Sequence, residues 1–273
     1  MGKFDGVLIC TDLDGTLYSS DKTISNENKE AIDYFKREGG CFTFITGRMP
    51  YYSMSAFEAV SPNVAFGCIN GGGLFDGHKR EYIWKTEIPS DAMDIVKYID
   101  QKVPTVGIQL CGFDMVCNAK QNVATDHYRR VTGHSGVTCH YSEFHKPLGK
   151  IIFCSDLEDD IQSVRDALSK NPISDRFDYI RTERILFEML PKGVNKGLAL
   201  KTLAEHLNVK ISHTIAIGDY DNDVAMLRAA GVGVAVANSS KAALEASDYT
   251  TVSNDENALA AVIRDLEAGK YGI

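Results

Sequence analysis

The sequence predicts an α/β protein in which a doubly wound parallel sheet is interrupted by an inserted α+β domain. Short apolar runs typical of buried strands alternate with helix-like segments up to residue 84, and this alternation resumes after Pro191. Such alternation implies parallel strands with helices on both faces of the sheet. The section between changes to tightly joined strand pairs, which indicates a separate unit. We therefore expect one domain made of residues 1–84 and 188–273, and a second domain at residues 85–187.

The first part of the chain shows the alternation most clearly. Ser25 can cap a helix that follows the first apolar run, and Gly39 with Gly40 can end it. The expected elements are a strand at 7–11, a helix at 25–38, a strand at 41–46, a helix at 50–60, a strand at 64–69, and a hairpin of 74–75 with 82–84.

The middle section joins its strands through tight turns. Gly112 separates two apolar runs, so we expect these two strands to be antiparallel. The expected elements are a helix at 90–102 with Ser90 as its cap, strands at 105–111 and 113–118, a weakly helical region at 121–132, a strand at 150–154, a helix at 158–169, and strands at 177–181 and 184–190.

The last part returns to strands that alternate with helices. Its expected elements are a helix at 195–207, a strand at 214–217, a helix at 221–230, a strand at 232–236, and helices at 241–246 and 256–268. This part therefore completes the doubly wound sheet that the first part begins.

The composition is that of an ordinary globular protein. The chain has 273 residues, 44% of them hydrophobic and 24% charged, with a net charge of −8. That negative charge disfavours nucleic acid and an anionic membrane surface as main partners. No apolar run approaches the roughly 18 residues of a membrane span, and the N-terminus lacks a signal-peptide pattern. We expect a cytoplasmic protein, a monomer or weak dimer, with its seven cysteines as reduced thiols.

Polar clusters follow the predicted parallel strands at the edge where open α/β sheets bind ligands. Asp12 and Asp14 follow the first strand, and Gly15 allows a sharp turn there. Lys196 opens a later helix. The other clusters are Thr46-Gly47-Arg48, Asn70-Gly71-Gly72 and Gly218-Asp219-Tyr220-Asp221-Asn222-Asp223.

Two carboxylates two residues apart share one side of an extended chain. At ~4 Å and an effective dielectric near 20, their repulsion is on the order of 4 kcal/mol. We therefore expect a cation beside Asp12 and Asp14, and hard oxygen ligands favour Mg²⁺. Asp219 and Asp223 can add to this site. The alternative is an Asp-rich turn that only caps a strand.

These groups together suit phosphoryl transfer. A carboxylate can attack phosphorus in line, and a second carboxyl can protonate the leaving oxygen. The hydroxyl of Thr46 and the backbone amides of Gly47 and Arg48 can donate to phosphate oxygens, and Lys196 supplies a compact positive charge. Positioning and charge neutralisation do most of the work in such reactions.

The sequence resembles the haloacid dehalogenase superfamily of aspartyl-phosphate phosphatases, and in particular its Cof-type branch. The resemblance covers essentially the whole chain and rests on four motifs in the family's order. They are Asp12-Leu13-Asp14-Gly15-Thr16-Leu17, Thr46-Gly47-Arg48, Lys196, and the segment from Gly218 to Asp223. The resemblance implies a Rossmann-like core, with a large cap inserted between the second and third motifs that selects the leaving group.

The resemblance also implies a role for each motif residue. Asp12 would be the nucleophile and Asp14 the general acid and base. Thr46 and Lys196 would hold the phosphoryl group, and Asn222 would contact phosphate or substrate. The metal ligands would be Asp12, the backbone carbonyl of Asp14, Asp219 and Asp223. The implied activity is Mg²⁺-dependent hydrolysis of small phosphate monoesters, such as sugar phosphates or phosphorylated cofactors.

Three alternatives remain open at this point. A phosphomutase could use the same scaffold, and a non-catalytic sensor could bind a phosphosugar or a protein. Arg48 could contact phosphate, or it could form a structural ion pair. Residues of metal-ligand type also crowd the middle section, but their spacing fits no standard zinc site, so we expect them in surface loops. They are His127, His134, Cys139, His140 and His145.

Overall fold

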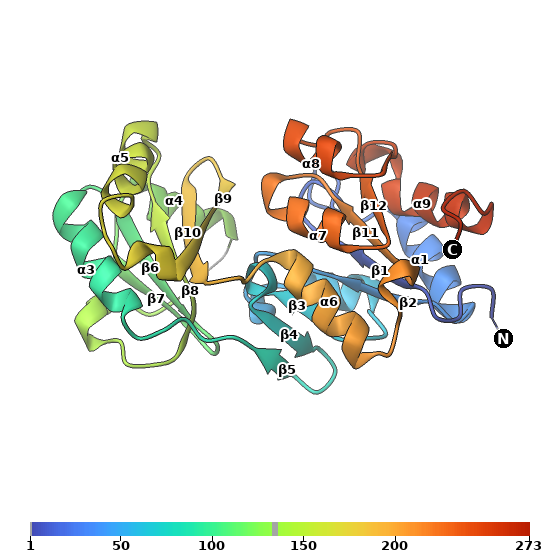
Figure 1. Cartoon of the computed structure of the whole chain (residues 1–273), viewed down its shortest axis with the longest axis horizontal. Coiled ribbons are helices and arrows are strands. Elements are labelled where there is room, and N and C mark those ends of the chain that lie inside the picture. Colours follow the sequence, from blue (N-terminus) through green and yellow to red (C-terminus); the bar gives the residue numbers. More distant parts are fainter. Residues whose placement is uncertain (1, 133–135) are drawn as a thin grey trace. The chain divides into compact units, whose positions relative to one another are not determined.

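The computed structural model describes residues 2–132 and 136–273, and it divides the chain into two compact units (Figure 1). The core unit consists of the chain up to Trp84 together with Asn195–Ile273, and the inserted unit is Lys85–Val194. The first boundary falls where the sequence places it. The second falls after residue 194 rather than after 187, because strand β10 (Leu186–Pro191) pairs within the inserted unit to its last residue.

The core unit is built on a parallel sheet of five strands. Their order is β13 (Tyr249–Thr250), β12 (Val232–Ala235), β11 (Thr214–Gly218), β1 (Leu8–Thr11) and β2 (Cys41–Phe44). Leu8 on β1 is paired with Thr214 on β11 and with Cys41 on β2. The two ends of the chain therefore share the centre of one sheet, which confirms the expected doubly wound parallel architecture.

Helices cover both faces of this sheet. The crossovers from β1 to β2 and from β11 to β12 run in opposite directions, so right-handed connections place their helices on opposite faces. On one face, Leu8 and Cys10 pack with apolar residues of the helices α6, α7 and α8. On the other, α1 and α9 pack together. The bounds are α1 Asn26–Arg37, α6 Lys196–His206, α7 Val224–Ala229, α8 Lys241–Ala246 and α9 Ala258–Glu267.

The expected third strand of the parallel sheet belongs instead to a small separate sheet. This sheet has the order β3 (Phe66–Cys68), β4 (Gly73–Asp76) and β5 (Glu81–Lys85), and β3 is antiparallel to β4. A single parallel bridge between Ile45 and Gly67 connects it to the segment after β2. Helix α2 (Met54–Val60) precedes it. The short chain between β3 and β4 favours the hairpin over a full parallel pairing.

The inserted unit is an antiparallel sheet with its own hydrophobic core. The strand order is β7 (Val116–Lys120), β6 (Gly107–Gly112), β8 (Leu148–Cys154), β10 and β9 (Phe177–Glu183). Alternate residues of the sheet, such as Phe153 and Met189, pack with the apolar sides of α3 (Ala92–Lys102) and α5 (Glu158–Leu168). Helix α4 (Val123–Thr132) completes this α+β unit.

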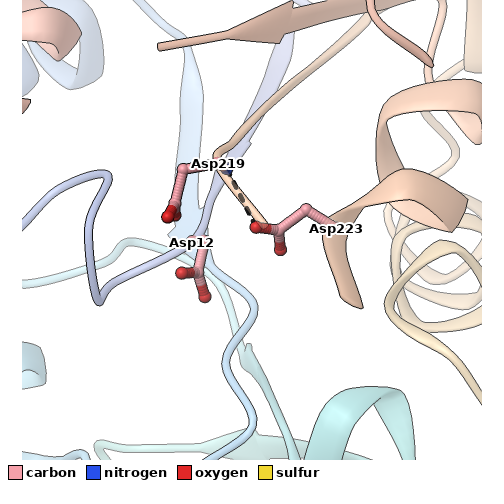
Figure 2. Close-up of side chains that lie close together, drawn as sticks. All are labelled: Asp12, Asp219 and Asp223. Atoms are coloured by element: carbon pink, nitrogen blue, oxygen red, sulfur yellow. Dashed lines mark hydrogen bonds between the residues drawn. The ribbon is translucent and has the colours of Figure 1, made fainter. Parts of the chain in front are cut away.

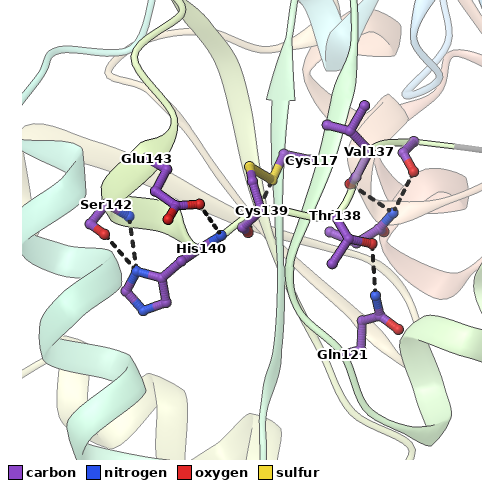
Figure 3. Close-up of a disulfide and its surroundings, with 10 residues drawn as sticks. Cys117, Gln121, Val137, Thr138, Cys139, His140, Ser142 and Glu143 are labelled. Carbon is purple, nitrogen blue, oxygen red and sulfur yellow. Dashed lines mark hydrogen bonds between the residues drawn. A yellow bond between two sulfur atoms is a disulfide. The ribbon is translucent and has the colours of Figure 1, made fainter.

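One disulfide contradicts the expectation of reduced thiols throughout. Cys117 on β7 is bonded to Cys139, with their Cα atoms 6.3 Å apart (Figure 3). The segment before Cys139 runs beside β7, because the amide of Asn118 donates to the Val137 carbonyl at 2.8 Å and the Val137 amide donates to Val116 at 2.9 Å. This pairing brings the two cysteines together. The free cysteines are Cys10, Cys41, Cys68, Cys111 and Cys154.

The histidines and the cysteine of the middle section that could in principle bind zinc do not form a cluster among the described residues. His127, His140 and His145 are exposed, and Cys139 is in the disulfide. His134 lies outside the described residues. Within residues 2–132 and 136–273, every helix is too short or too polar to cross a membrane.

Candidate active site

Three carboxylates converge at the carboxyl ends of β1 and β11. Asp12 follows β1, Asp219 follows β11, and Asp223 ends the single turn after it. One oxygen from each lies within 4.8 Å of the others (Figure 2). The backbone amide of Asp12 donates to the Ile217 carbonyl at 2.8 Å, so the pairing of the two central strands brings the first and fourth motifs together. Among the described residues, this is the group suited to hold a metal ion.

Lys196 is buried against this cluster. It begins helix α6, whose N-cap Asn195 accepts a hydrogen bond from the Leu198 amide at 3.0 Å. The Lys196 Nζ lies 2.5 Å from Asp12 Oδ1 and 2.5 Å from Asp223 Oδ1. Burial alone would lower the pKa of Lys196, but the two carboxylates outweigh burial and raise it, so the ammonium stays charged.

The charge balance of the site fits a divalent cation. Three carboxylates against one ammonium leave a formal charge of −2 in a buried place. Burial raises the pKa of Asp12 well above its usual value, although Lys196 opposes the rise. Burial, together with the charge of Asp223, raises the pKa of Asp219 to about 6. Oxygen donors with uncompensated negative charge are the ligand set that Mg²⁺ prefers, so the residues present fit this ion.

The turn after β1 holds the Asp219 carboxylate in place. The Thr16 hydroxyl donates to Asp219 Oδ1 at 2.6 Å. Gly15 has φ of +83°, and a Cβ at Gly15 would lie 2.5 Å from Asp219 Oδ2. Glycine is therefore required at this position both for the backbone conformation and for the space that Asp219 occupies. Thr16 is not among the site residues predicted from the sequence, although its place in the first motif puts it beside the acidic residues.

Asp223 has a different role from its two neighbours. Its Oδ2 accepts hydrogen bonds from the backbone amides of Asp219 and Tyr220, both at 3.0 Å, while its Oδ1 accepts from Lys196. The side chain is fully buried. Asp223 thus holds both the turn that carries Asp219 and the ammonium of Lys196, and it leaves few lone pairs for a metal ion.

Asp14 points away from the acidic cluster and pairs with two cations. Arg48 donates from Nε to Asp14 Oδ2 at 2.8 Å and from Nη2 to Oδ1 at 2.7 Å, and the Lys22 Nζ lies 3.1 Å from Oδ1. Burial alone would raise the pKa of Asp14, but these cations outweigh burial and hold it below its usual value. The Asp14 side chain therefore lies outside the cluster of Asp12, Asp219 and Asp223.

The second motif lies at the end of β2 and contacts the turn after β3. Thr46 is buried, and its hydroxyl oxygen accepts from the Arg48 amide at 3.3 Å. A Cβ at Gly47 would lie 2.9 Å from Asn70 Oδ1, and the same oxygen accepts from the Asn222 side chain at 3.1 Å. Asn70 thus links the second and fourth motifs. The sequence signals it only through the Asn70-Gly71-Gly72 turn.

The Asn70-Gly71-Gly72 turn also packs against the start of the helix that carries Lys196. Asn70 and Gly71 both have positive φ, of 51° and 95°. A Cβ at Gly71 would lie 2.0 Å from the carbonyl oxygen of Asn195, the residue that caps the lysine helix. The turn therefore packs its backbone against the first turn of α6, and a side chain at Gly71 would push the lysine helix away.

The structure thus brings Asp12, Asp219, Asp223 and Lys196 together, pairs Asp14 with Arg48, and joins Asn222 to the second motif through Asn70. Carboxylates and a lysine buried at the carboxyl end of a parallel sheet define a site of the class that binds a metal ion and a phosphoryl group, as in metal-dependent phosphoryl-transfer proteins.

Comparisons with known proteins agree with this class. The sequence profile of the haloacid dehalogenase-like hydrolases matches residues 9–263, so the chain belongs to that family. It is 27% identical over 267 residues to 5-amino-6-(5-phospho-D-ribitylamino)uracil phosphatase YitU of Bacillus subtilis, covering 94% of this chain and 96% of the relative.

Two further comparisons cover nearly the whole chain. The protein is 28% identical over 267 residues to 5-amino-6-(5-phospho-D-ribitylamino)uracil phosphatase YbjI of Escherichia coli, with 94% of each chain covered. A haloacid dehalogenase-like hydrolase from Bacteroides thetaiotaomicron superposes with a TM-score of 0.83 at 23% identity, covering 97% of this chain and all of that one. The fold is therefore shared over both units.

Proposed function

We propose that this protein is a Mg²⁺-dependent phosphatase that hydrolyses small phosphate monoesters through an aspartyl-phosphate on Asp12. The observation that carries the proposal is the buried cluster in which one ammonium faces three carboxylates. Asp12 is the member that suits attack on phosphorus, because it ends the central strand and its Oδ1 is oriented by Lys196 at 2.5 Å.

The residues of the site divide the work as follows. Asp12, Asp219 and the backbone carbonyl of Asp14 would hold Mg²⁺, with Asp223 supporting the ion directly or through water. The bound ion would neutralise charge on the phosphoryl oxygens and on the nucleophile. Lys196 would hold the phosphoryl group and offset the charge of Asp12, and Thr46, the Gly47 and Arg48 amides and Asn222 would bind its oxygens. These last roles rest on the motif resemblance and on the donors that each residue offers.

Asp14 would donate and take up the protons that the reaction needs. Its cations hold the pKa of Asp14 low in the free protein, so it would gain its proton as a negatively charged phosphate ester binds beside it and raises that pKa. In the first step the Asp12 oxygen forms a bond to phosphorus, the bond to the leaving oxygen breaks, and a proton from Asp14 makes the leaving group an alcohol. In the second step Asp14 takes a proton from water, the water oxygen attacks phosphorus, and Asp12 is released with inorganic phosphate. The inserted unit would act as the cap that selects the leaving group.

The substrate class follows from the relatives and from the chemistry of the site. Two relatives are named as phosphatases of a phosphorylated ribitylaminouracil. We propose a small phosphorylated metabolite of this kind, a sugar phosphate or phosphorylated cofactor, acted on in the cytoplasm by a monomer or weak dimer. Phosphate release should be screened with such esters, pyridoxal phosphate and flavin mononucleotide, with and without Mg²⁺.

The decisive variant is Asp12→Asn. It keeps the size of the side chain but removes the nucleophilic charge, so phosphate release should fall below detection while the circular dichroism spectrum stays unchanged. Asp21→Asn is a matched control, because Asp21 is an exposed acid near the same turn with no contact to the cluster; it should keep full activity. Turnover by Asp12→Asn would refute the nucleophile. Activity that requires a bisphosphorylated sugar and releases no phosphate would indicate a mutase.

A further inference from the structure

The ion pair between Arg48 and Asp14 is the strongest contact that the proposed reaction leaves unexplained. The planar guanidinium donates to both oxygens of Asp14, at 2.8 and 2.7 Å. Such a two-pronged contact fixes the plane of the carboxylate as well as its place, which a single lysine contact does not do. Lys22 adds only one contact, at 3.1 Å from Oδ1.

Arg48 is itself held in place from two sides. Its backbone amide donates to the Thr46 hydroxyl oxygen at 3.3 Å, at the end of β2. Its guanidinium carbon lies 5.4 Å from the centre of the Tyr18 ring, within the range of a cation–π interaction. Tyr18 is buried, and its amide donates to the Leu13 carbonyl at 2.8 Å. Arg48 therefore connects the first and second motifs through parts that are themselves fixed.

Asp14 has little else to orient its side chain. It lies in the turn between Leu13 and Gly15, outside the acidic cluster, and its side chain is 39% exposed. A partly exposed carboxylate on a turn can rotate about two bonds unless a partner restrains it. A proton donor must lie within hydrogen-bond reach of the leaving oxygen, so the direction in which Asp14 points governs how well it can act.

We propose that Arg48 is a positioning residue, whose guanidinium acts on turnover through the orientation of Asp14 and not by contact with the phosphoryl group. This inference rests on the proposed function, because it assumes that Asp14 protonates the leaving group. If the proposal is right, the effect of Arg48 on the rate of hydrolysis depends on the leaving group of the ester. A residue that binds the phosphoryl group would affect every phosphate ester alike.

The test compares two phosphate esters that differ in their need for a proton. The alkoxide that leaves an alkyl phosphate is strongly basic and requires protonation, whereas 4-nitrophenolate leaves without it. The quantity to measure is kcat/KM, which reports the step in which the leaving group departs. For Arg48→Met, the ratio of kcat/KM for a sugar phosphate to kcat/KM for 4-nitrophenyl phosphate should fall about tenfold or more, since a positioned acid contributes roughly 10²–10⁴-fold.

Three matched variants separate positioning from other roles. Lys22→Met removes the weaker cation and should lower the same ratio by a smaller factor. Arg48→Lys keeps the charge but loses the two-pronged contact, so it should recover only part of the loss. Asn222→Ala removes a proposed phosphoryl ligand whose side chain is bonded to Asn70, and it should lower kcat/KM for both esters by the same factor. Thermal melting of each variant identifies any that fail to fold. If Arg48→Met does not fold, Arg48→Lys replaces it in the comparison, after circular dichroism has confirmed that Arg48→Lys is folded.

Each outcome has a definite meaning. A lowered ratio in Arg48→Met, with partial recovery in Arg48→Lys, supports the proposal. An equal loss for both esters overturns it and returns Arg48 to phosphate binding. An unchanged or raised ratio also overturns it, because the ion pair would then be structural or would restrain Asp14. If the wild-type protein hydrolyses neither ester, the proposed function itself fails, which is distinguishable from an active enzyme with equal losses.

Discussion

Two short contacts decide where the Asp219 carboxylate lies. The Thr16 hydroxyl donates to one of its oxygens at 2.6 Å, and the missing side chain of Gly15 leaves room for the other. Both contacts come from the turn that follows β1 and Asp12. At the scale of single residues, the metal site therefore depends on a glycine and a threonine as well as on the carboxylates themselves.

Gly15→Ala should weaken both folding and metal binding. The positive φ of +83° costs a residue with a Cβ about 1–2 kcal/mol of folding free energy, and the added methyl would lie 2.5 Å from Asp219 Oδ2. Displacing this carboxylate should reduce Mg²⁺ affinity by about tenfold or more. Urea unfolding and titration calorimetry measure the two effects.

Gly6→Ala separates the backbone effect from the clash. Gly6 has φ of +81°, but a Cβ there would meet nothing within 4 Å. This variant should lose only the conformational contribution to stability and should bind Mg²⁺ like the wild type. Equal Mg²⁺ affinity in Gly15→Ala and Gly6→Ala would contradict the role given to the Gly15 contact.

The stability of the metal-free protein should fall as pH rises through about 6. Burial raises the pKa of Asp219 from 3.8 to about 6, so folding favours its protonated form. The stabilising contribution of this group is fully present below pH 3.8 and is lost as Asp219 ionises near pH 6. Mg²⁺ should offset this loss, because it binds the ionised carboxylate.

Thermal melting across about pH 5 to 7 checks this prediction, as the window follows from the pKa of Asp219. The gain in Tm on adding Mg²⁺ should grow over that window, and Asp219→Asn should flatten both trends. A Tm gain that is independent of pH, or one that is unchanged in Asp219→Asn, would argue against Asp219 as the responsible group.

The sequence predicts which residues meet at the site, but it does not predict the orientation of every side chain. Asp12, Asp219, Asp223 and Lys196 follow from motifs at the ends of parallel strands, and the topology brings them together. The direction of Asp14 is different, because it is set by Arg48, a residue 34 positions later, at the end of another strand. Side-chain spacing along β1 gives no information about such a partner.

At the scale of helices and strands, the sequence predicts a contact best when the two residues that make it are close in the chain. Ser25 caps α1 by accepting from the Asn28 amide at 3.1 Å, as the sequence predicts. Ser90 does not cap α3, which begins after Asp91 without a side-chain cap bond. The disulfide between Cys117 and Cys139 depends on a segment that returns beside β7 after α4, and this return is a tertiary contact that composition does not signal.

The sheet of the inserted unit contains an ion pair that is almost fully buried. The Lys150 Nζ on β8 lies 2.8 Å from Glu188 Oε1 on β10, and their side chains are 4% and 3% exposed. The Thr182 hydroxyl on β9 donates to the same oxygen at 3.0 Å. Taking two charges out of water costs several kcal/mol, so each charge depends on its partner.

Lys150→Met should destabilise the protein by about 3–5 kcal/mol, because it leaves the Glu188 charge buried without its cation. The double variant Lys150→Met with Glu188→Leu should regain most of that stability, since no buried charge remains. Denaturant unfolding measures both. The exposed pair of Lys146 and Asp114 is the control, and Lys146→Met should change stability by less than about 1 kcal/mol. A double variant as unstable as the single one would contradict this account.

At the scale of the whole molecule, the two units differ in how the chain makes them. The inserted unit is one continuous segment, Lys85–Val194, with its own sheet and apolar core. The core unit needs both ends of the chain, since β1 lies between β2 and β11 in its sheet. The change of pattern near residue 85 predicts the division, but the second boundary depends on the pairing of β10 with its neighbours, which a single strand does not reveal.

The segment 85–194 should therefore fold when produced alone. We expect a cooperative thermal transition and dispersed amide signals in a nuclear magnetic resonance spectrum, because its core is formed within the segment. The fragment 1–84 should remain unfolded, since the strands that complete its sheet are missing. A disordered 85–194 fragment would show that the inserted unit depends on the core unit for its stability.

The position of β11 next to β1 has a consequence during synthesis on the ribosome. Asp12 is translated early, whereas Lys196 emerges 184 residues later, which takes about 10–40 s at typical elongation rates. Throughout that interval the nascent chain carries Asp12 without the ammonium and the carboxylates that surround it in the folded protein. The buried cluster can therefore form only when the polypeptide is nearly complete, because Lys196, Asp219 and Asp223 all lie in the last third of the chain.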